Sequence, residues 1–343
     1  MLDARFLILD PRCSLFVARF EYRESSIENP ASGIEHRSKS GRLLLPEIVL
    51  LGLLAFPGTI GAQELEARAY ANTPVGVNFI ALAYAYSAGN VFFDPSLPIE
   101  DADGRTNIVA ARYVRSIGLF GKPGKVKALV PFASGHWDGF VDSEFRTRDA
   151  TGFADARIGF DLLVSGAPPL KPSEFATYRQ RTIVGLGLDV IMPTGDYDPT
   201  KVINLGSNRW AFNPEIAVSQ AVGDKWILEV VGSAWIYTDN TDFNNGSTLE
   251  QDELYSIGLV GIRNVRPGFW WALGVAYGEG GATRVDGVVR ATLQRNWRFG
   301  AFLAYALTRN QGVSVSILSG VTGRVGADFD SIAVGYQYSW GGR

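Results

Sequence analysis

Ser134, His136 and Asp138 follow directly after a predicted strand and are the residues best placed for covalent chemistry. A serine becomes a nucleophile when a histidine within hydrogen-bond reach accepts its proton. Alternate residues of a strand share one face, and a strand rises by ~3.3 Å per residue. The Cβ atoms of Ser134 and His136 should therefore lie about 6–7 Å apart. Contact at that separation needs favourable rotamers, and this glycine-spaced pair is more typical of an ordinary loop. We therefore predict that the chain is not an enzyme and keep a lipid hydrolase as an alternative.

The ligand types in the chain do not predict a metal centre. Cys13, the sole cysteine, precedes the predicted cleavage site, and His136 is the one histidine that follows it. Acidic residues gather at 239–253 and again at Asp328 and Asp330, but their spacing matches no defined calcium-binding loop. We expect these carboxylates to lie in solvated loops, with no metal and no cofactor.

Charged residues on the polar face of otherwise apolar strands are better candidates for a functional site. Opposite charges on an inner wall can pair and fill an interior, or they can line a narrow polar path. Both interpretations fit the pattern. Barrels of eight strands enclose a filled interior and barrels of 16–18 strands leave a water channel, and a barrel of twelve strands is intermediate in size. The candidates are Asp155, Arg157, Asp161, Arg181, Asp189, Glu215, Glu229 and Arg298.

Strands with a strict alternation of residue types must position these charges. In residues 181–192 the even positions, including Leu186 and Leu188, are almost wholly apolar, whereas the odd positions include glycine and charge. A period of two over such a length indicates a strand, and a membrane-crossing strand needs about 9–11 residues. Because a lipid-facing Arg or Lys at mid-membrane costs ~2–4 kcal/mol, the polar face must turn inward.

Twelve alternating segments follow one another along the chain. Short turns follow the second, sixth, eighth and tenth segments, and long polar loops follow the first, third, fifth and seventh segments. This alternation is typical of outer-membrane barrels whose termini lie in the periplasm. Residues 165–180 depart from this parity, and Ser173 there should cap one helical turn on the periplasmic side. The sequence predicts an all-β chain, a single antiparallel up-and-down transmembrane β-barrel of about 12 strands, with a soluble β-sandwich as the lesser alternative. The predicted strands are 75–87, 105–117, 125–133, 152–164, 181–192, 210–221, 225–239, 254–264, 269–278, 288–307, 313–319 and 331–340.

The region before these strands has the order of an export signal. Arg42 precedes a nine-residue apolar core at 48–56, and Gly61-Ala62 offers a cleavage site before Gln63. Basic, apolar and small residues in that order are typical of a secretory signal. We predict a signal peptide at 41–62, a barrel at 63–343, and a doubtful extension at 1–40 that an early start codon would produce.

Four segments carry a resemblance to known proteins: residues 70–93 (YANTPVGVNFIALAYAYSAGNVFF), 203–214 (INLGSNRWAFNP), 294–298 (QRNWR) and 328–340 (DFDSIAVGYQYSW). They look like the bacterial outer-membrane family labelled "putative MetA-pathway of phenol degradation", whose members are often called transporters. The resemblance covers nearly all of residues 68–340. It implies a barrel fold and a role in moving aromatic or other hydrophobic compounds, and it carries over no catalytic residues.

Three functions are consistent with this sequence. The leading hypothesis is a bacterial outer-membrane channel or transporter for small hydrophobic or aromatic molecules. The second is a structural barrel whose lumen is closed by salt bridges, and the third is the lipid hydrolase. The expected partners are outer-membrane lipid, a small solute, and the barrel-assembly machinery, which would read the C-terminal strand that ends near Trp340. The formal net charge of −3 gives no sign of nucleic-acid binding.

Overall fold

The computed structural model describes residues 65–342, apart from 93–98, 142, 143, 176, 202 and 323–325. Most of these residues lie in β-strands, and the one α-helix among them is the single turn α1 (Pro172–Phe175). This turn lies in the segment where the sequence predicts one, but it begins at Pro172 and ends at Phe175, so Ser173 lies inside the turn and not at its cap position. No helix in the described ranges has the length and apolarity needed to cross a membrane. The predicted signal peptide and extension lie outside the described residues.

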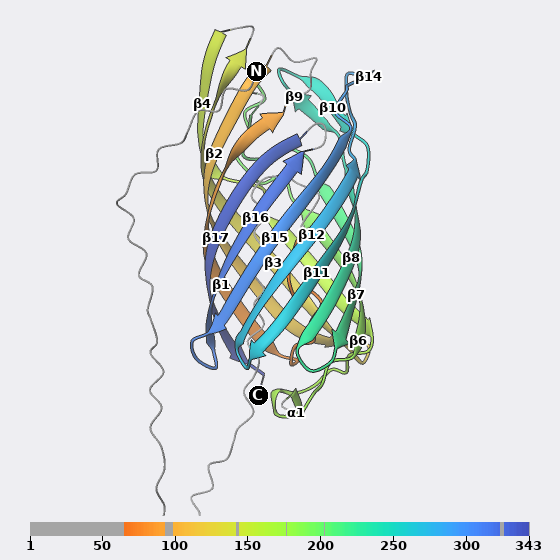
Figure 1. The fold of residues 1–343 in the computed structure, drawn as a ribbon. Helices are drawn as coiled ribbons and strands as arrows, with labels where there is room; N and C mark the ends of the chain where they lie inside the picture. The colour runs from red at the N-terminus through yellow and green to blue at the C-terminus, as the bar shows by residue number, and fades with distance from the viewer. Residues whose placement is uncertain are drawn as a thin grey trace, which may run out of the picture. The chain divides into compact units, whose positions relative to one another are not determined.

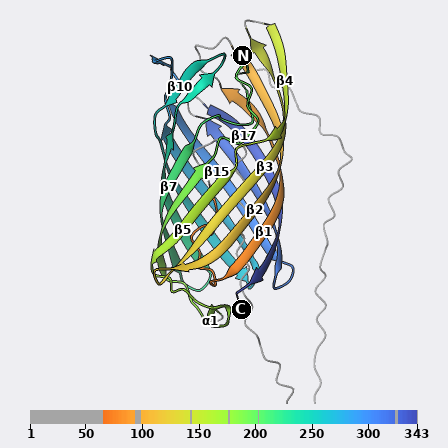
Figure 2. The ribbon, with the colours of Figure 1, turned by 180° about the vertical axis from the view of Figure 1, so that it is seen from behind.

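Twelve antiparallel wall positions close into a barrel, which confirms the predicted fold (Figures 1 and 2). Consecutive strands pair around the wall, and the last strand pairs with the first from Val77↔Gly341 to Phe92↔Gly326. The fourth position is shared by β4 and β5, which both pair with β3. The wall strands are β1 (Val77–Phe92), β2 (Ile99–Leu119), β3 (Lys122–Val141), β4 (Glu144–Phe153), β5 (Arg157–Ser165), β6 (Thr182–Ile191), β7 (Ala211–Val222), β8 (Trp226–Tyr237), β11 (Leu254–Arg266), β12 (Phe269–Gly280), β15 (Gln294–Ala306), β16 (Gln311–Thr322) and β17 (Gly326–Gly341).

The alternation in the sequence decides which side chains face the membrane. On β6, Leu186 is 46% exposed on the outer surface, whereas Ile183 on the opposite parity is fully buried. The same outward apolar face continues on other strands, for example at Leu82 and Leu228. In a bilayer every backbone polar group must be paired internally, and a closed barrel meets this condition. The apolar outer band therefore identifies a transmembrane barrel.

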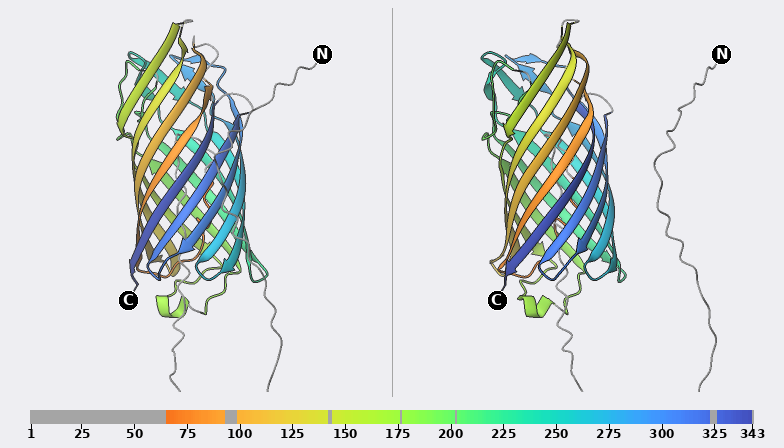
Figure 3. Two further views of the ribbon diagram at one scale, coloured as in Figure 1. Left: turned by 60° about the vertical axis from the view of Figure 1, so that its left-hand side comes forward. Right: turned by 90° about the vertical axis from the view of Figure 1, so that its left-hand side faces the viewer.

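The two ends of the barrel differ, as the predicted parity of long and short loops requires. The short turns, α1 and the C-terminus lie together at one end (Figure 1). At the other end the hairpin of β3 and β4 rises beyond the rim (Figure 3). A separate four-stranded sheet also lies there, made of β9 (Asn240–Phe243), β10 (Ser247–Gln251), β13 (Thr283–Val285) and β14 (Val288–Val289). We call the first end periplasmic and the second external.

Two predicted strands are divided in the structure for physical reasons. The predicted strand 288–307 is interrupted, because Val288 pairs with Val285 in a hairpin whose turn residues, Asp286 and Gly287, both have positive φ. The predicted strand 152–164 is broken at 154–156, because Asp155 turns away from the wall to accept hydrogen bonds from the loop after β6. The number of wall positions is unaffected by either change.

Candidate functional site

Residues 65–76, which precede β1, lie inside the barrel and are called here the lumen plug. Leu65 and Ala67 are buried against inward residues of the wall such as Ile262 and Trp270. Tyr70, which is 1% exposed, packs in a second cluster that includes Ile183 on β6. The plug therefore packs against the inner face of the wall through apolar contacts.

A notch of glycines on β6 receives the Tyr70 ring. A Cβ atom at Gly185 would lie 2.2 Å from Cδ1 of Tyr70, and one at Gly187 would lie 2.4 Å from its hydroxyl oxygen. The Tyr70 hydroxyl donates a hydrogen bond of 2.7 Å to Glu215 on β7. Burial and the neighbouring carboxylates, Glu215 first, raise the pKa of Tyr70, so that it stays protonated and continues to donate. The glycines of this strand thus make space for the plug.

Polar contacts also hold the plug to the wall. The Glu66 carboxylate forms an ion pair of 3.0 Å with Arg112 on β2. The backbone amide of Arg68 donates a hydrogen bond of 2.8 Å to Glu229 on β8. The Lys125 ammonium group on β3 donates one of 2.6 Å to a plug carbonyl, that of Ala69. The plug is bound to three different strands by charged or charge-assisted contacts.

A buried group of four charges, here called the charge cluster, lies beside the plug. Nζ of Lys127 on β3 lies 2.8 Å from Asp161 on β5 and 3.0 Å from Asp189 on β6. Arg157 lies 3.5 Å from the second oxygen of Asp189. All four side chains are at most 14% exposed. Removing one partner of such a cluster would leave an uncompensated buried charge.

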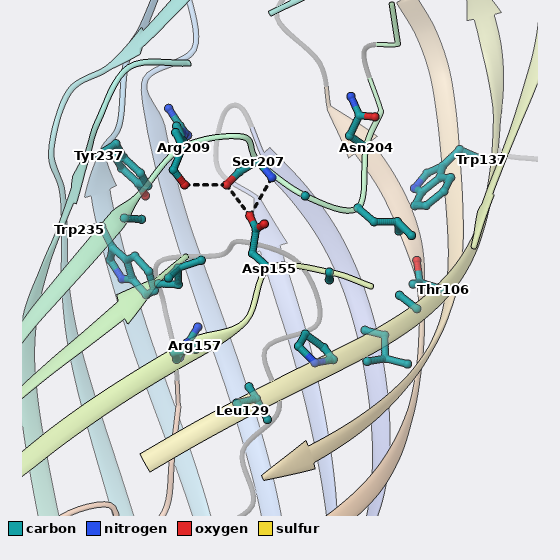
Figure 4. Close-up of a pocket in the computed structure, with 18 residues that line it drawn as sticks. Thr106, Leu129, Trp137, Asp155, Arg157, Asn204, Ser207, Arg209, Trp235 and Tyr237 are labelled. Carbon is teal, nitrogen blue, oxygen red and sulfur yellow. Dashed lines mark hydrogen bonds between the residues drawn. The ribbon is translucent and has the colours of Figure 1, made fainter. Parts of the chain in front are cut away.

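A cavity of about 290 Å³ lies at the external end of the lumen and is called the outer cavity (Figure 4). Its aromatic lining comes from Trp137 on β3 and from Trp235 and Tyr237 on β8. Aliphatic side chains, among them Leu129 and Leu205, complete an apolar wall. Arg157 belongs both to this wall and to the charge cluster, so the cluster separates the cavity from the plug.

The loop at 192–210 closes the outer cavity on one side and is anchored by Asp155. One Asp155 oxygen accepts a hydrogen bond from the backbone amide of Gly195 at 2.9 Å, and the other accepts from the amide of Ser207 at 2.7 Å. The Ser207 hydroxyl donates a further bond of 2.5 Å to Asp155 (Figure 4). The loop also places Arg209 over the ring of Tyr237, at 4.5 Å from the centroid.

The eight residues predicted from the sequence fall into five places. Asp161, Asp189 and Arg157 meet in the charge cluster, and Asp155 anchors the loop beside the cavity. Glu215 and Glu229 bind the plug. Arg181 precedes β6, is exposed, and lines a second cavity of about 750 Å³ at the periplasmic mouth, while Arg298 has the inward parity of β15.

Sequence reasoning missed the residues that join these places. Lys127 and Lys125 share the parity of the buried Leu129 on β3, and this alternation was the available signal. Arg112 on β2 was missed because the faces of that strand are ambiguous in the sequence. Nothing in the alternation of the strands indicates that the segment before β1 fills the lumen.

The residues suspected of covalent chemistry lie on the outer surface of the β3–β4 hairpin. The Ser134 hydroxyl bonds to the Thr151 hydroxyl at 2.9 Å, and Nδ1 of His136 lies 2.7 Å from Asp149. Nε2 of His136 lies 3.7 Å from Asp138. Among the described residues no hydrogen bond joins Ser134 to His136, so this geometry lacks the contact that a serine nucleophile requires. No group of three His, Cys, Asp or Glu suited to a metal occurs in the part of the chain that the structure describes.

Residues 65–336 match the model of the family described as "Putative MetA-pathway of phenol degradation". The chain belongs to this family. The barrel is similar to an outer-membrane channel from Pseudomonas putida F1, with a TM-score of 0.67, 22% identity, and coverage of 81% of this chain and 100% of that one. The β domain of the Bordetella autotransporter BrkA matches with a TM-score of 0.48 and 11% identity, over 78% of this chain and 100% of that one. No curated protein matches the sequence.

The fold determines where the protein resides. A closed barrel with an apolar outer band, periplasmic turns and external loops is the architecture of bacterial outer-membrane proteins. The chain is therefore an outer-membrane β-barrel, and its outer surface contacts membrane lipid.

Proposed function

We propose that this barrel takes up small hydrophobic or aromatic molecules across the outer membrane. The outer cavity is the observation that carries the proposal. Its lining combines Trp137, Trp235 and Tyr237 with aliphatic side chains, and its volume of about 290 Å³ lies near the small end of the range of ligand sites, roughly 300–1,000 Å³. A wall of this chemistry favours a small apolar solute over a hydrated one.

The barrel wall beside the cavity supports a route from the membrane. Among the described strands β4 pairs only with β3, so its other edge lacks a strand partner. The loop at 192–210 covers this edge through two contacts between Phe153 and Asp196, in which each backbone amide donates to the other residue, at 3.1 and 2.8 Å. A hydrophobic molecule would enter here by displacing a loop, whereas elsewhere it would have to break a ladder of strand hydrogen bonds.

The lumen plug favours a second candidate, a structural barrel without a solute path. The plug and the charge cluster together occupy the lumen between the outer cavity and the cavity at the periplasmic mouth. Under the leading proposal the plug shifts during passage, whereas under the second it stays in place and the cavity has no occupant.

Uptake of radiolabelled naphthalene by cells that express the barrel separates the two candidates. Leu205→Trp would fill the cavity from the loop without interrupting a strand ladder, and Val289→Trp on the exposed β14 hairpin is the matched control. We expect uptake to fall severalfold for Leu205→Trp and to be unchanged for Val289→Trp. Equal uptake by both variants and by cells without the barrel would support the structural barrel.

A further inference from the structure

One cation in the wall of the outer cavity has no acidic side chain within ion-pair distance among the described residues. Arg209 is 8% exposed, and its guanidinium lies over the Tyr237 ring. Its Nη2 donates to the side-chain oxygen of Gln251, and its Nη1 is buried without a hydrogen-bond partner. Both direct partners are uncharged, and a buried charge is costly unless it is paired.

The charged groups nearest to Arg209 are already occupied or lie further away. Asp155 accepts three hydrogen bonds from Gly195 and Ser207, as described above. Arg157, the other cation of the cavity wall, has Asp189 as its partner. Burial lowers the pKa of Arg209 even though Asp155 and Asp239 favour its charged form from a longer range. Arg209 is thus the cavity cation that remains available for an anionic ligand.

Flat apolar surface adjoins this cation. The Tyr237 ring stacks on the guanidinium, and Trp235 lies two residues away on the same inward face of β8. The planar fork of an arginine matches a carboxylate with two parallel hydrogen bonds, which are stronger than a bond to an uncharged amide. A guanidinium that turns from Gln251 toward the cavity would therefore exchange a weaker acceptor for a stronger one.

We infer that the outer cavity binds a single-ring aromatic carboxylate, with the carboxylate at Arg209 and the ring against Trp235 and Tyr237. This inference rests on the proposed function and specifies its solute class. The volume of about 290 Å³ accommodates one aromatic ring with its carboxylate.

Binding of two probes of similar size tests the inference. Purified barrel in detergent is titrated with benzoate and with uncharged benzyl alcohol, and affinity is measured by calorimetry. Arg209→Gln removes the charge, Arg209→Lys keeps it without the planar fork, and Arg295→Gln is the control, since Arg295 pairs with Glu279 on the outer surface. Migration of the unheated protein in gels verifies that each variant is folded.

We expect Arg209→Gln to weaken benzoate binding by about tenfold or more and to change benzyl alcohol binding much less. The benzoate affinity of Arg209→Lys should lie between those of wild type and Arg209→Gln. Arg295→Gln should bind both probes like wild type. Equal benzoate affinity in wild type and Arg209→Gln would overturn the inference, as would binding of benzyl alcohol without benzoate. That last result would leave the proposed function intact, whereas a barrel that binds neither probe would argue against both.

Discussion

The hydroxyl group of Tyr70 lies 2.7 Å from the Glu215 carboxylate and joins the lumen plug to the wall at β7. The ring occupies space that Gly185 and Gly187 leave on the neighbouring strand, since a Cβ atom at either position would overlap it. One aromatic side chain therefore combines the close packing and the hydrogen bonding that hold the plug against the wall.

Replacing Tyr70 with alanine should open the lumen. The substitution removes a ring that is 1% exposed and the hydrogen bond that the Tyr70 hydroxyl donates to Glu215; loss of a buried aromatic side chain costs roughly 3–5 kcal/mol. We expect a higher single-channel conductance in planar bilayers while the barrel remains assembled. Tyr255→Ala on the exposed outer surface is the control and should conduct like wild type. Identical conductance in all three proteins would show that Tyr70 does not limit the path.

Leu186→Arg and Gly187→Arg, at adjacent positions, should fail in different ways. Leu186 faces lipid near the middle of β6, where an arginine costs ~2–4 kcal/mol. An arginine at Gly187 enters the lumen, where it meets Tyr70, Asp161 and Glu215 and displaces the plug. Folding yield in lipid vesicles should fall more for Leu186→Arg, and conductance should rise for the Gly187→Arg barrel that does assemble. A larger loss of yield for Gly187→Arg would contradict this assignment of faces.

Lys127→Met should destabilise the barrel strongly. The ammonium group is the shared partner of Asp161 and Asp189, and both carboxylates are buried. Removing one member of a buried ion-paired group typically costs ~3–5 kcal/mol. Urea unfolding in detergent micelles would measure the loss. Arg146→Met at the exposed pair with Glu144 serves as control and should change the free energy of unfolding by less than ~1 kcal/mol; equal losses for both variants would refute the structural role of Lys127.

Arg157→Ala should alter permeability without preventing assembly. Arg157 pairs with Asp189, contacts the Trp235 ring at 5.6 Å from its centroid, and forms part of the outer cavity. Its removal enlarges the outer cavity toward the charge cluster and takes away one positive charge there. We expect changed conductance and higher cation preference, measured as a shift in reversal potential under a salt gradient. Asp242→Ala on the external sheet is the control and should leave conductance and reversal potential unchanged. Unchanged values for Arg157→Ala as well would favour the structural barrel.

The wall of the barrel could be predicted because lipid selects one residue type at every second position. The charges on β5 and β6 share a lumen wall for the same reason, and their strands pair from Arg157↔Ile191 onward. The alternation predicts glycine-rich β6 as a strand. It does not predict why the glycines are there, because they make space for Tyr70, which lies in another part of the chain.

Contacts that depend on loops and on the plug left no periodic signal. Arg209 lies in a loop without alternation, and its place over Tyr237 follows from the hydrogen bonds of Asp155. Lys127 has the inward parity of β3, yet parity alone does not say that its ammonium group bridges two carboxylates from different strands. Tertiary geometry decides both, and the sequence pattern specifies only which face each residue occupies.

The position of the plug has a consequence for the order of assembly. The plug precedes the described strands in the chain, yet the Arg68 side chain donates a hydrogen bond to Asn264, which lies 196 residues later. The seam between β1 and β17 brings Asn78 to Trp340 across 262 residues, and contacts of such high sequence separation form slowly. Because the plug runs directly into β1, pairing of β1 with β17 also fixes where the plug enters the lumen, so seating of the plug and closure of the seam are coupled.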